Sequence, residues 1–494
     1  MLLYLIDFLG ELSYDRKKDH IVGFVELANG RKCLFADHAL VFMIEGVEDC
    51  WKQPVAFYFS EGGVNSSDLK SLIVDVARKL FSIGLKVIAT VCDQYAANCK
   101  AVNMLLNDTE EYYKTKNLHW NKLFFEIDGH EIVPLYDPPH LLKCMRNNFA
   151  QYNVKFIGLD GDKYEASWKD IIDYYNYDST SSLFRRCPTL TEHHPDLTKM
   201  KRMKVSLAAL VFSQRVAQGL QNSGYLEAHG SVTSYGTGGF LMFMDYLFDS
   251  VNGLSKLPFN GKQFRCAMFN KSAHTIFWRE AKLVLNSMQF IKSKGLTKVF
   301  TKPPCIKNWI RTIEGLSYIW QKLKVVPRFS YLCTTNFNQD SLENFFGCIR
   351  SQGASNNNPS CYSFVSAFRT LLVNNLSSRH STSANCEIDD TTGLLATFRV
   401  FLNNEDVLET DPLINMSIDA ERFYFQDMSL YSKTASAYVA GYCTKKLIGY
   451  VGECHVCTSE LLADTIGRDE ASWIASRDYT DHSLLVPGNS ALNT

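Results

Sequence analysis

Two acidic side chains have the type and setting of metal ligands in a nuclease centre. Asp93 ends the apolar run LKVIATVC, and Glu343 lies in FNQDSLENFFGCIR, three residues after Asp340. Carboxylates presented by the end of a strand or the first turn of a helix can hold a divalent cation that activates water against a phosphodiester. Each also has a purely structural interpretation. Asp93 is a possible helix cap, and Asp340 with Glu343 has the spacing of a capping box.

The helix predicted after Asp340 has an apolar stripe with Glu343 on its border. The stripe consists of Leu342, Phe345, Phe346 and Ile349. At 3.6 residues per turn, Glu343, Gly347 and Arg350 lie about 100° from this stripe. The glycine leaves room for a substrate backbone one turn beyond the glutamate. Arg350 is therefore a candidate phosphate contact beside Glu343.

A second helix start, DPPHLLKCMRNN, carries further polar groups. Proline directly after Asp137 is a strong helix-start signal, so capping is the favoured role of this accessory acidic residue. His140, Lys143 and Arg146 follow at three-residue spacing and share one face of the helix. That face contacts either nucleic-acid phosphates or solvent.

Composition limits the classes of function. The 494 residues suffice for about three domains, and 46% of them are hydrophobic. A net charge of −1 gives no global attraction to nucleic acid, so DNA contacts must come from local patches. The 15 cysteines have no regular spacing, and no signal peptide precedes them, which favours reduced thiols in the cytosol or nucleus. The apolar stretches are shorter than the ~18 residues of a membrane span.

The first 150 residues have the element order of an RNase H-like domain. Four short runs rich in β-branched and aromatic residues come first, namely LLYLIDF, HIVGFVEL, ALVFMIEG and PVAFYFS. A helix from Ser67, the buried strand LKVIATVC, a helix at about 95 to 106, the strand EIVPLYD and the helix of Asp137 follow. Consecutive strands followed by alternating helices and strands predict a mixed α/β sheet with helices against it.

The remaining chain divides into three parts. Residues 151–330 are interpreted as an α-helical insertion, because apolar residues recur at helical spacing and no strand pattern is as strong. Within it, SYGTGG reads as a turn, and KMKRMK is either a nuclear import signal or a solvated first turn of a helix. Residues 331–380 return to the core with the helix of Glu343. Residues 381–494 are predicted to form an acidic linker and a mostly helical C-terminal region.

The combined motifs resemble those of the P element and THAP-type DNA transposases of animals. The matching stretches occur in family order: LSYDRKKDHIVGF, ALVFMIEGVEDCWKQPVAFYFS, GLKVIATVCDQ, DPPHLLKCMRNN, MKVSLAALVFSQRVAQGL, PPCIKNWIRTIEGLSYIW, FNQDSLENFFGCIRSQG, NNNPS and AYVAGYCTKKL. The resemblance implies an RNase H-like core interrupted by a helical GTP-binding insertion. It also implies DNA transposition in the nucleus, by Mg²⁺-dependent phosphodiester cleavage followed by strand transfer from the freed 3′ hydroxyl.

The resemblance assigns three acidic ligands to a two-metal centre. Asp93 matches the ligand that ends the fourth strand, Glu343 matches the ligand on the late helix, and Asp340 matches an additional acidic position. The first-strand ligand is ambiguous, because counting back without gaps from LSYD reaches Tyr4. Either Asp7 substitutes for this ligand or the ligand is missing.

Two hypotheses follow for the chain. The first is a DNA transposase core that uses Asp7, Asp93 and Glu343 and assembles as a homo-oligomer when complete. The second is a shortened or domesticated non-catalytic derivative that binds DNA or a partner. We expect an upstream region with a zinc-dependent DNA-binding domain to be missing from this sequence. No nucleotide motif in the insertion matches residue by residue, so GTP contacts cannot be assigned.

Overall fold

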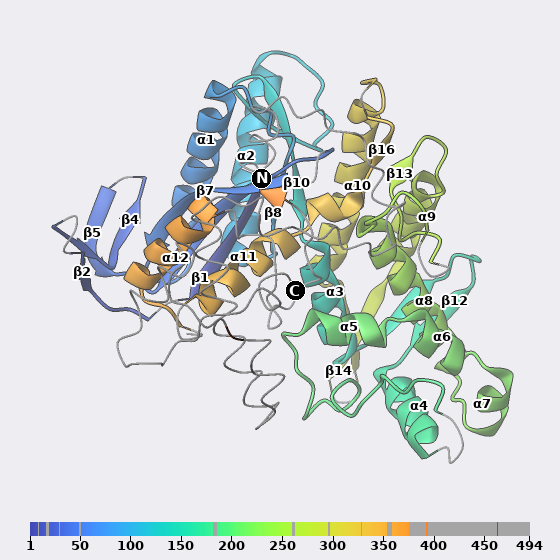
Figure 1. Ribbon diagram of the computed structural model, residues 1–494. Coiled ribbons are helices and arrows are strands. Elements are labelled where there is room, and N and C mark those ends of the chain that lie inside the picture. The colour runs from blue at the N-terminus through green and yellow to red at the C-terminus, as the bar shows by residue number, and fades with distance from the viewer. Residues whose placement is uncertain are drawn as a thin grey trace. The chain divides into compact units, whose positions relative to one another are not determined.

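Figure 1 shows the computed structural model of the chain. It describes residues 1–374, except for positions 8, 16–18, 29, 49–50, 181–184, 259–261, 295–296, 328 and 353–357, together with residues 392–393 and Leu462. One compact unit spans Met1–Glu405, and a second spans Asp406–Thr494. The predicted acidic linker and C-terminal helical region fall almost wholly outside the described residues and stay predictions.

The core is a mixed sheet with strand order β5-β4-β7-β6-β1-β8-β10-β9, to which β17 adds by pairing with β7. Its strands are β1 (Leu2–Asp7), β4 (Phe24–Leu27), β5 (Gly30–Phe35), β6 (His38–Glu45), β7 (Trp51–Ser60), β8 (Ala89–Cys92), β9 (Phe125–Ile127), β10 (His130–Tyr136) and β17 (Thr392–Gly393). A separate hairpin joins β2 (Ser13–Asp15) and β3 (His20–Val22). β1 lies inside the sheet, antiparallel to β6 and parallel to β8. The predicted strands and their β-then-βαβα order are therefore confirmed.

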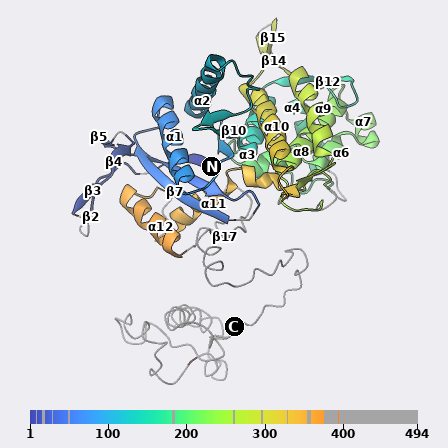
Figure 2. The same cartoon turned by 90° about the horizontal axis from the view of Figure 1, so that it is seen from above.

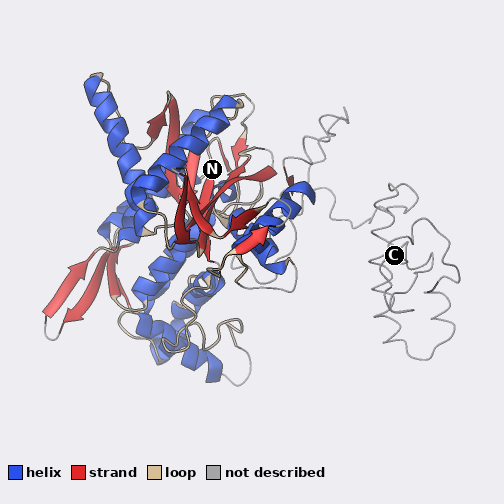
Figure 3. Ribbon diagram, turned by 90° about the vertical axis from the view of Figure 1, so that its left-hand side faces the viewer, coloured by secondary structure: helices blue, strands red, loops and turns tan. Residues whose placement is uncertain are grey.

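Helices cover both faces of this sheet. α1 (Ser66–Ser82) and α2 (Ala96–Thr115) lie together on one face, and α11 (Asp340–Ser351) and α12 (Cys361–Asn374) lie on the other (Figure 2). Coverage on both sides explains why β6 and β8 are almost continuously apolar and buried. In Figure 3 the strands of the core form one twisted layer between helices.

Local sequence signals determine where the helices of the core begin. Asn65 caps α1 by accepting from the backbone N–H groups of Ser67 and Asp68. α3 (Pro138–Phe149) begins with two prolines, and Asp137 caps it by accepting from the His140 N–H. The capping role predicted for Asp137 is confirmed.

The insertion contains a sheet that the sequence reading missed. The four-stranded sheet has the order β12-β11-β14-β15, made from β11 (Asn153–Ile157), β12 (Lys163–Ala166), β14 (Gln289–Lys294) and β15 (Thr297–Thr301). The hairpin of β14 and β15 projects from the insertion (Figure 2). These strands are short and partly polar, so their period-2 pattern was weaker than that of the neighbouring helices.

Helices form most of the rest of the insertion. They are α4 (Trp168–Thr180), α5 (Val205–Val211), α6 (Gln214–Leu220), α7 (Ser223–Ala228), α8 (Ser234–Val251), α9 (His274–Ser287) and α10 (Pro304–Leu323). The run MKVSLAALVFSQRVAQGL is two helices, because the Ser213 hydroxyl caps α6 at the Val216 N–H. SYGTGG is not a turn but the start of α8. Gly236 approaches the backbone carbonyl of Glu165 so closely that a Cβ would clash.

The chain returns to the core through α10, whose Gly315 packs on Val133 and Leu135 of β10. The short pairing of β13 (Met268–Phe269) with β16 (Tyr331–Leu332) and the 3₁₀ turn η1 (Thr334–Phe337) then lead into α11. Leu342, Phe345 and Phe346 of α11 are buried against the sheet, as the predicted stripe requires. Among the described residues, no helix is long and apolar enough to cross a membrane.

Candidate functional site

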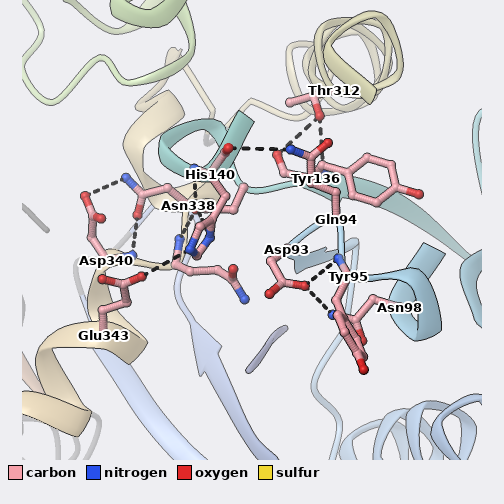
Figure 4. A network of polar contacts seen from close by, with 12 residues as sticks. Asp93, Gln94, Tyr95, Asn98, Tyr136, His140, Thr312, Asn338, Asp340 and Glu343 are labelled. Carbon is pink, nitrogen blue, oxygen red and sulfur yellow. Dashed lines mark hydrogen bonds and ion pairs between the residues drawn. The ribbon is translucent and has the colours of Figure 1, made fainter. Parts of the chain in front are cut away.

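Asp93 stands where β8 leaves the sheet toward α2. Its Oδ1 accepts from the Tyr95 N–H at 2.9 Å and from the Asn98 side-chain amide at 2.6 Å (Figure 4). These two bonds support the first turn of α2, although the helix cap itself is Tyr95. Because both bonds engage Oδ1, they fix the direction of the carboxylate. The structural role and the ligand role of Asp93 are therefore compatible.

Asp137 joins two segments that are about 200 residues apart in sequence. It is 1% exposed. Its Oδ2 accepts from the His140 N–H at 2.9 Å, and its Oδ1 accepts from the Gln339 N–H at 2.7 Å. Gln339 in turn donates its side-chain amide to the Leu3 carbonyl of β1 at 2.6 Å. One buried carboxylate thus ties the start of α11 to β1 and α3.

Asp340 does not cap α11, contrary to the sequence reading. The helix begins at Asp340, and the cap position is Gln339, which makes no side-chain cap bond. Instead the Asn338 Oδ1 accepts from the Asp340 N–H at 3.0 Å, and the Asn338 amide donates to Asp340 Oδ2 at 3.1 Å. The difference arises because the Asn338 side chain bonds the backbone two residues later, which places Asp340 inside the first turn of the helix and not at its cap.

His140 lies between the carboxylates of Asp137 and Glu343. Its Nδ1 is 3.0 Å from Asp137 Oδ2, and its Nε2 is 3.7 Å from Glu343 Oε1. Burial disfavours the imidazolium, but the two carboxylates outweigh it and raise the pKa of His140. Burial also raises the pKa of Glu343, although His140 opposes this shift. The pair forms a polar centre beside Asp93 (Figure 4).

Tyr4 occupies the position on β1 that faces this centre. β1 runs parallel to β8 with Leu2 level with Val91, so Tyr4 is level with Asp93. The Tyr4 ring stacks on His140 with centroids 5.6 Å apart, and it also contacts Phe346. Burial first, then Glu343 and Asp93, raise the pKa of its phenol well above the usual range, so Tyr4 stays protonated. An uncharged ring therefore stands where a first-strand ligand would stand.

Asp7 lies apart from Asp93 and Glu343. It follows Tyr4 by three residues, so its side chain leaves the opposite face of the strand, and it lies about 10 Å farther along. Asp7 pairs with His38 Nε2 at 3.0 Å, and its side chain is 79% exposed. The geometry of β1 does not support Asp7 as the partner of the other two carboxylates.

The four basic groups proposed to contact nucleic acid have different settings. His140 is buried against Tyr4. Arg146 is fully buried and donates to the Asn147 side chain and the Arg202 carbonyl, so it is a structural residue and not a surface contact. Lys143 and Arg350 are half-buried. Both lie close enough to Glu343 to affect its pKa, which leaves these two as candidates for phosphate contact.

Asp93 and Glu343 present oxygen ligands of the kind that a divalent metal ion prefers. Mg²⁺ is held in proteins by one or two carboxylates together with water and substrate phosphates, and Asp93 with Glu343 supplies such a pair. Within the described part of the chain, no group of three or more histidine, cysteine, aspartate or glutamate residues could hold a metal ion. Asp93 and Glu343 are therefore two carboxylates that suit a divalent ion by their chemistry, and the described residues do not add the third ligand of the predicted two-metal centre.

The fold defines the chain as an RNase H-like domain interrupted by an insertion, and comparisons with known proteins agree. Three family models match: the TNP-like RNase H N-terminal domain at residues 9–106, the TNP-like GTP-binding insertion domain at 139–264, and the TNP-like RNase H C-terminal domain at 336–369. Together they cover about half of the chain. The chain belongs to the P element and THAP-type transposase family.

Individual relatives support this assignment. The transposable element P transposase of Drosophila melanogaster is 24% identical over 418 residues, which are 83% of this chain and 52% of that protein. The DNA transposase THAP9 of Homo sapiens is 23% identical over 73% of this chain and 39% of that protein. The chain thus spans about half or less of the length of these relatives. The Drosophila P element transposase strand transfer complex shares the fold, with a TM-score of 0.58, 20% identity, and coverage of 75% of this chain and 76% of that one.

Proposed function

We propose that the chain is the core of a P element-like DNA transposase, which cleaves DNA phosphodiesters and transfers the cut strand to a target. The proposal rests on one observation above all. The RNase H-like sheet and α11 bring Asp93 and Glu343, which are 250 residues apart, to one polar centre. DNA ends and target DNA would be its substrates, the nucleus its location, and a homo-oligomer its assembled form.

The residues of the centre would have distinct tasks. Asp93 and Glu343 would hold a divalent ion, which when bound would activate water and stabilise charge on the phosphate. Asp137 positions α11 and orients His140, which touches Glu343. Lys143 and Arg350 would contact substrate phosphates, because cations beside the carboxylates offset repulsion between the site and DNA. Asp340, held by Asn338, would shape the first turn that presents Glu343.

The experiment that tests this function is DNA cleavage in Mg²⁺ with the chain joined to a DNA-binding module. Transposon-end DNA is compared with scrambled DNA, using the parent chain, Asp93→Ala and Glu343→Ala. We expect end-specific nicks from the parent chain and a loss of about 10²-fold or more in each variant. Asp7→Asn is the matched control and should cleave like the parent. If all four proteins cleave equally, Asp93 and Glu343 are not ligands.

One observation favours a second candidate, a non-catalytic DNA-binding derivative. Tyr4 fills the place of a first-strand carboxylate, and Asp7 cannot reach the centre. In this case the parent chain binds end DNA in a band-shift assay but does not nick it at any Mg²⁺ concentration. Cleavage by the parent chain that depends on Asp93 rejects this candidate.

We also propose that the insertion binds GTP, as the name of its family model suggests. A cavity of about 240 Å³ in this region has aromatic walls. Its lining residues include Phe156, Tyr164, Tyr235, Phe243 and Asp160. Aromatic walls suit the flat face of a purine base. No lysine or arginine lines the described cavity, so the phosphates would extend beyond it.

Nucleotide binding can be measured independently of DNA cleavage. Fluorescent GTP is titrated into the parent chain and Tyr235→Ala. Tyr112→Ala is the control, because Tyr112 is 49% exposed, close to the 52% of Tyr235, but lies on α2. Loss of one stacking ring should weaken binding about tenfold, and the control should bind like the parent. Equal affinity for all three proteins would remove this cavity from consideration.

A further inference from the structure

Two cysteines meet where the core is joined to the last helix of the insertion. Cys144 lies on α3, and Cys305 lies in the first turn of α10. The two helices pack against each other. The two thiols are hydrogen-bonded to one another. The fold therefore brings together two side chains, far apart in the sequence, that have the chemistry to form a disulfide.

A glutamine between the two helices supports this arrangement independently of the sulfur atoms. The Gln94 side-chain amide donates to the His140 carbonyl of α3 at 3.5 Å. Its Oε1 accepts from the Asn308 side-chain amide of α10 at 3.1 Å. Cys144 lies about one helical turn after His140, and Cys305 lies about one turn before Asn308. Bonds that do not involve sulfur therefore hold α3 and α10 in the register in which the thiols meet.

The two thiols differ in exposure and in acidity. Cys144 is half-buried, whereas Cys305 is 0% exposed. The hydrogen bond with Cys305 lowers the pKa of Cys144, although burial opposes this shift, and Gln94 and Lys143 lower the pKa further. The bond with Cys144 and burial raise the pKa of Cys305. Because the thiolate is the nucleophilic form, Cys144 is the thiol that reacts first with an oxidant.

Cys99 of α2 provides a comparison within the same chain. It is half-buried like Cys144, and it is hydrogen-bonded to Asn308 of α10. Burial raises the pKa of its thiol, however. Cys99 therefore has an exposure similar to that of Cys144 but not its acidity, so an oxidant that reaches both side chains should react with Cys144.

We propose that Cys144 and Cys305 form an oxidisable dithiol, which a peroxide converts into a disulfide between α3 and α10. The Cys144 thiolate attacks one oxygen of hydrogen peroxide and becomes a sulfenic acid, and the other oxygen leaves as hydroxide and takes up a proton. The Cys305 thiol then attacks the Cys144 sulfur, the S–O bond breaks, and the oxygen leaves as water. Two thiols are oxidised and one peroxide is reduced, which gives one disulfide and two water molecules.

The disulfide closes a covalent ring around most of the insertion. It joins α3 to the start of α10, so residues 145–304 become a closed loop. Cross-linking a long loop restricts the unfolded chain and stabilises the fold, and a small thiol reverses the bond by exchange. The oxidation state of the pair therefore sets the stability of the link between core and insertion. The proposal goes beyond the proposed DNA cleavage and does not depend on it.

The test uses the full chain, fully reduced and then treated with a few molar equivalents of hydrogen peroxide. Remaining thiols are blocked with N-ethylmaleimide in denaturant, and the peptides are mapped by mass spectrometry. We expect a cross-linked peptide pair that contains Cys144 and Cys305, and a maleimide on Cys99. The melting temperature of the oxidised chain should exceed that of the reduced chain by about 5 °C, and dithiothreitol should reverse the shift.

Three single variants separate the roles of the cysteines. Cys305→Ser removes the second thiol, so Cys144 should stop at the sulfenic acid, which dimedone traps. Cys144→Ser removes the reactive thiolate, so Cys305 should stay reduced. Cys99→Ser is the matched control and should form the disulfide and show the melting shift of the parent chain.

Three outcomes in the parent chain overturn the proposal. Oxidation of Cys99 to the same extent as Cys144 shows that the contact with Cys305 does not make Cys144 selectively reactive. Recovery of Cys144 and Cys305 as free thiols after peroxide treatment shows that the pair is packing and not an oxidation site. A disulfide between Cys144 and any cysteine other than Cys305 shows that the two thiols do not meet.

Discussion

At the scale of the residue, the proposed metal site turns on Tyr4 of β1, because the resemblance to the transposase family implies a carboxylate on this strand. The backbone of β1 is in place, because its register with β8 puts Tyr4 level with Asp93. The phenol stays protonated and packs on His140, so Tyr4 brings no negative charge to the centre. A single substitution at Tyr4 therefore tests whether the proposed site can bind a divalent cation.

Tyr4→Asp should create a site for divalent or trivalent cations. A third carboxylate beside Asp93 and Glu343 should raise affinity roughly tenfold or more, because affinity for hard cations rises with the number of carboxylate ligands. Sensitised terbium luminescence, competed with Mg²⁺, measures the affinity without any DNA. Tyr4→Phe is the matched control for loss of the hydroxyl. Unchanged terbium binding in Tyr4→Asp would mean that the aspartate does not reach the centre.

At the scale of elements, the site depends on how α11 is attached to the sheet. Asp137 contacts the start of α11 through the Gln339 N–H, and it also caps α3. Ser341 of α11 donates to Glu45 of β6 at 3.1 Å, which adds a second tie. Glu343 is therefore placed by bonds made by its neighbours in the first turn of the helix.

Asp137→Ala should destabilise the chain through these bonds. Loss of a helix cap costs about 1 kcal/mol, and a buried N–H of Gln339 left without its acceptor costs about 1 to 3 kcal/mol more. Asp137→Asn retains a carbonyl oxygen that can accept one of the bonds, so it should cost less. Urea unfolding of the two variants and the parent measures the difference. Equal losses would show that charge, and not hydrogen-bond geometry, is what Asp137 contributes.

A buried aspartate in the insertion predicts a pH dependence of stability. Asp245 of α8 is largely buried beside Asp249 and Lys262, and burial raises its pKa to about 6. A carboxyl group whose folded pKa is raised stabilises the fold while protonated, so this contribution is full below about pH 4 and is lost as pH rises through 6. The two-unit shift corresponds to about 2 to 3 kcal/mol.

Asp245→Asn should remove that pH dependence. Its unfolding free energy, measured in urea at pH 4.5 and pH 7, should differ less between the two values than that of the parent chain. Lys262 keeps its contact with Asp249 at 2.8 Å in the variant. Asp173→Asn on α4 is the control, because the Asp173 side chain is 40% exposed and pairs with Lys169, and it should retain the pH dependence of the parent. If the unfolding free energy of Asp245→Asn changes with pH as much as that of the parent chain, groups other than Asp245 cause the pH dependence.

The sequence predicted elements better than it predicted contacts. Apolar runs located β1, β6 and β10, because extensive burial leaves a strong signal, and β7 was located by its aromatic and β-branched residues although it is only partly buried. β11 and β14 were not predicted, because short strands beside long amphipathic helices have only a weak period-2 pattern in the sequence. Asp93 and Glu343 could be selected from their positions at element ends, but Tyr4 could not be assigned its place. Its place follows from the pairing of β1 with β8, in which Leu2 is level with Val91, 89 positions later in the sequence.

At the scale of the whole molecule, the proposed DNA binding must depend on local charge. The chain has a formal net charge of −1, so the overall field does not attract DNA. Lys143 and Arg350 are the half-buried cations beside Glu343, whereas Arg146 is internal. Lys143 of α3 and Arg350 of α11 are therefore the candidates for phosphate contact. Arg146, one turn after Lys143 on α3, is not.

The salt dependence of DNA affinity should distinguish Lys143 from Arg146. Each phosphate neutralised by a protein cation contributes about 0.9 to the slope of log affinity against log salt concentration. Lys143→Ala should therefore reduce the magnitude of the slope by about 0.9 and leave stability nearly unchanged. Arg146→Ala should leave the slope unchanged and cost about 2 to 4 kcal/mol of stability, because it empties a buried volume and removes the bond to Arg202. Fluorescence anisotropy at four salt concentrations, paired with urea unfolding, measures both quantities. The opposite pattern would place the Arg146 side chain on the DNA and would reject its buried arrangement in α3.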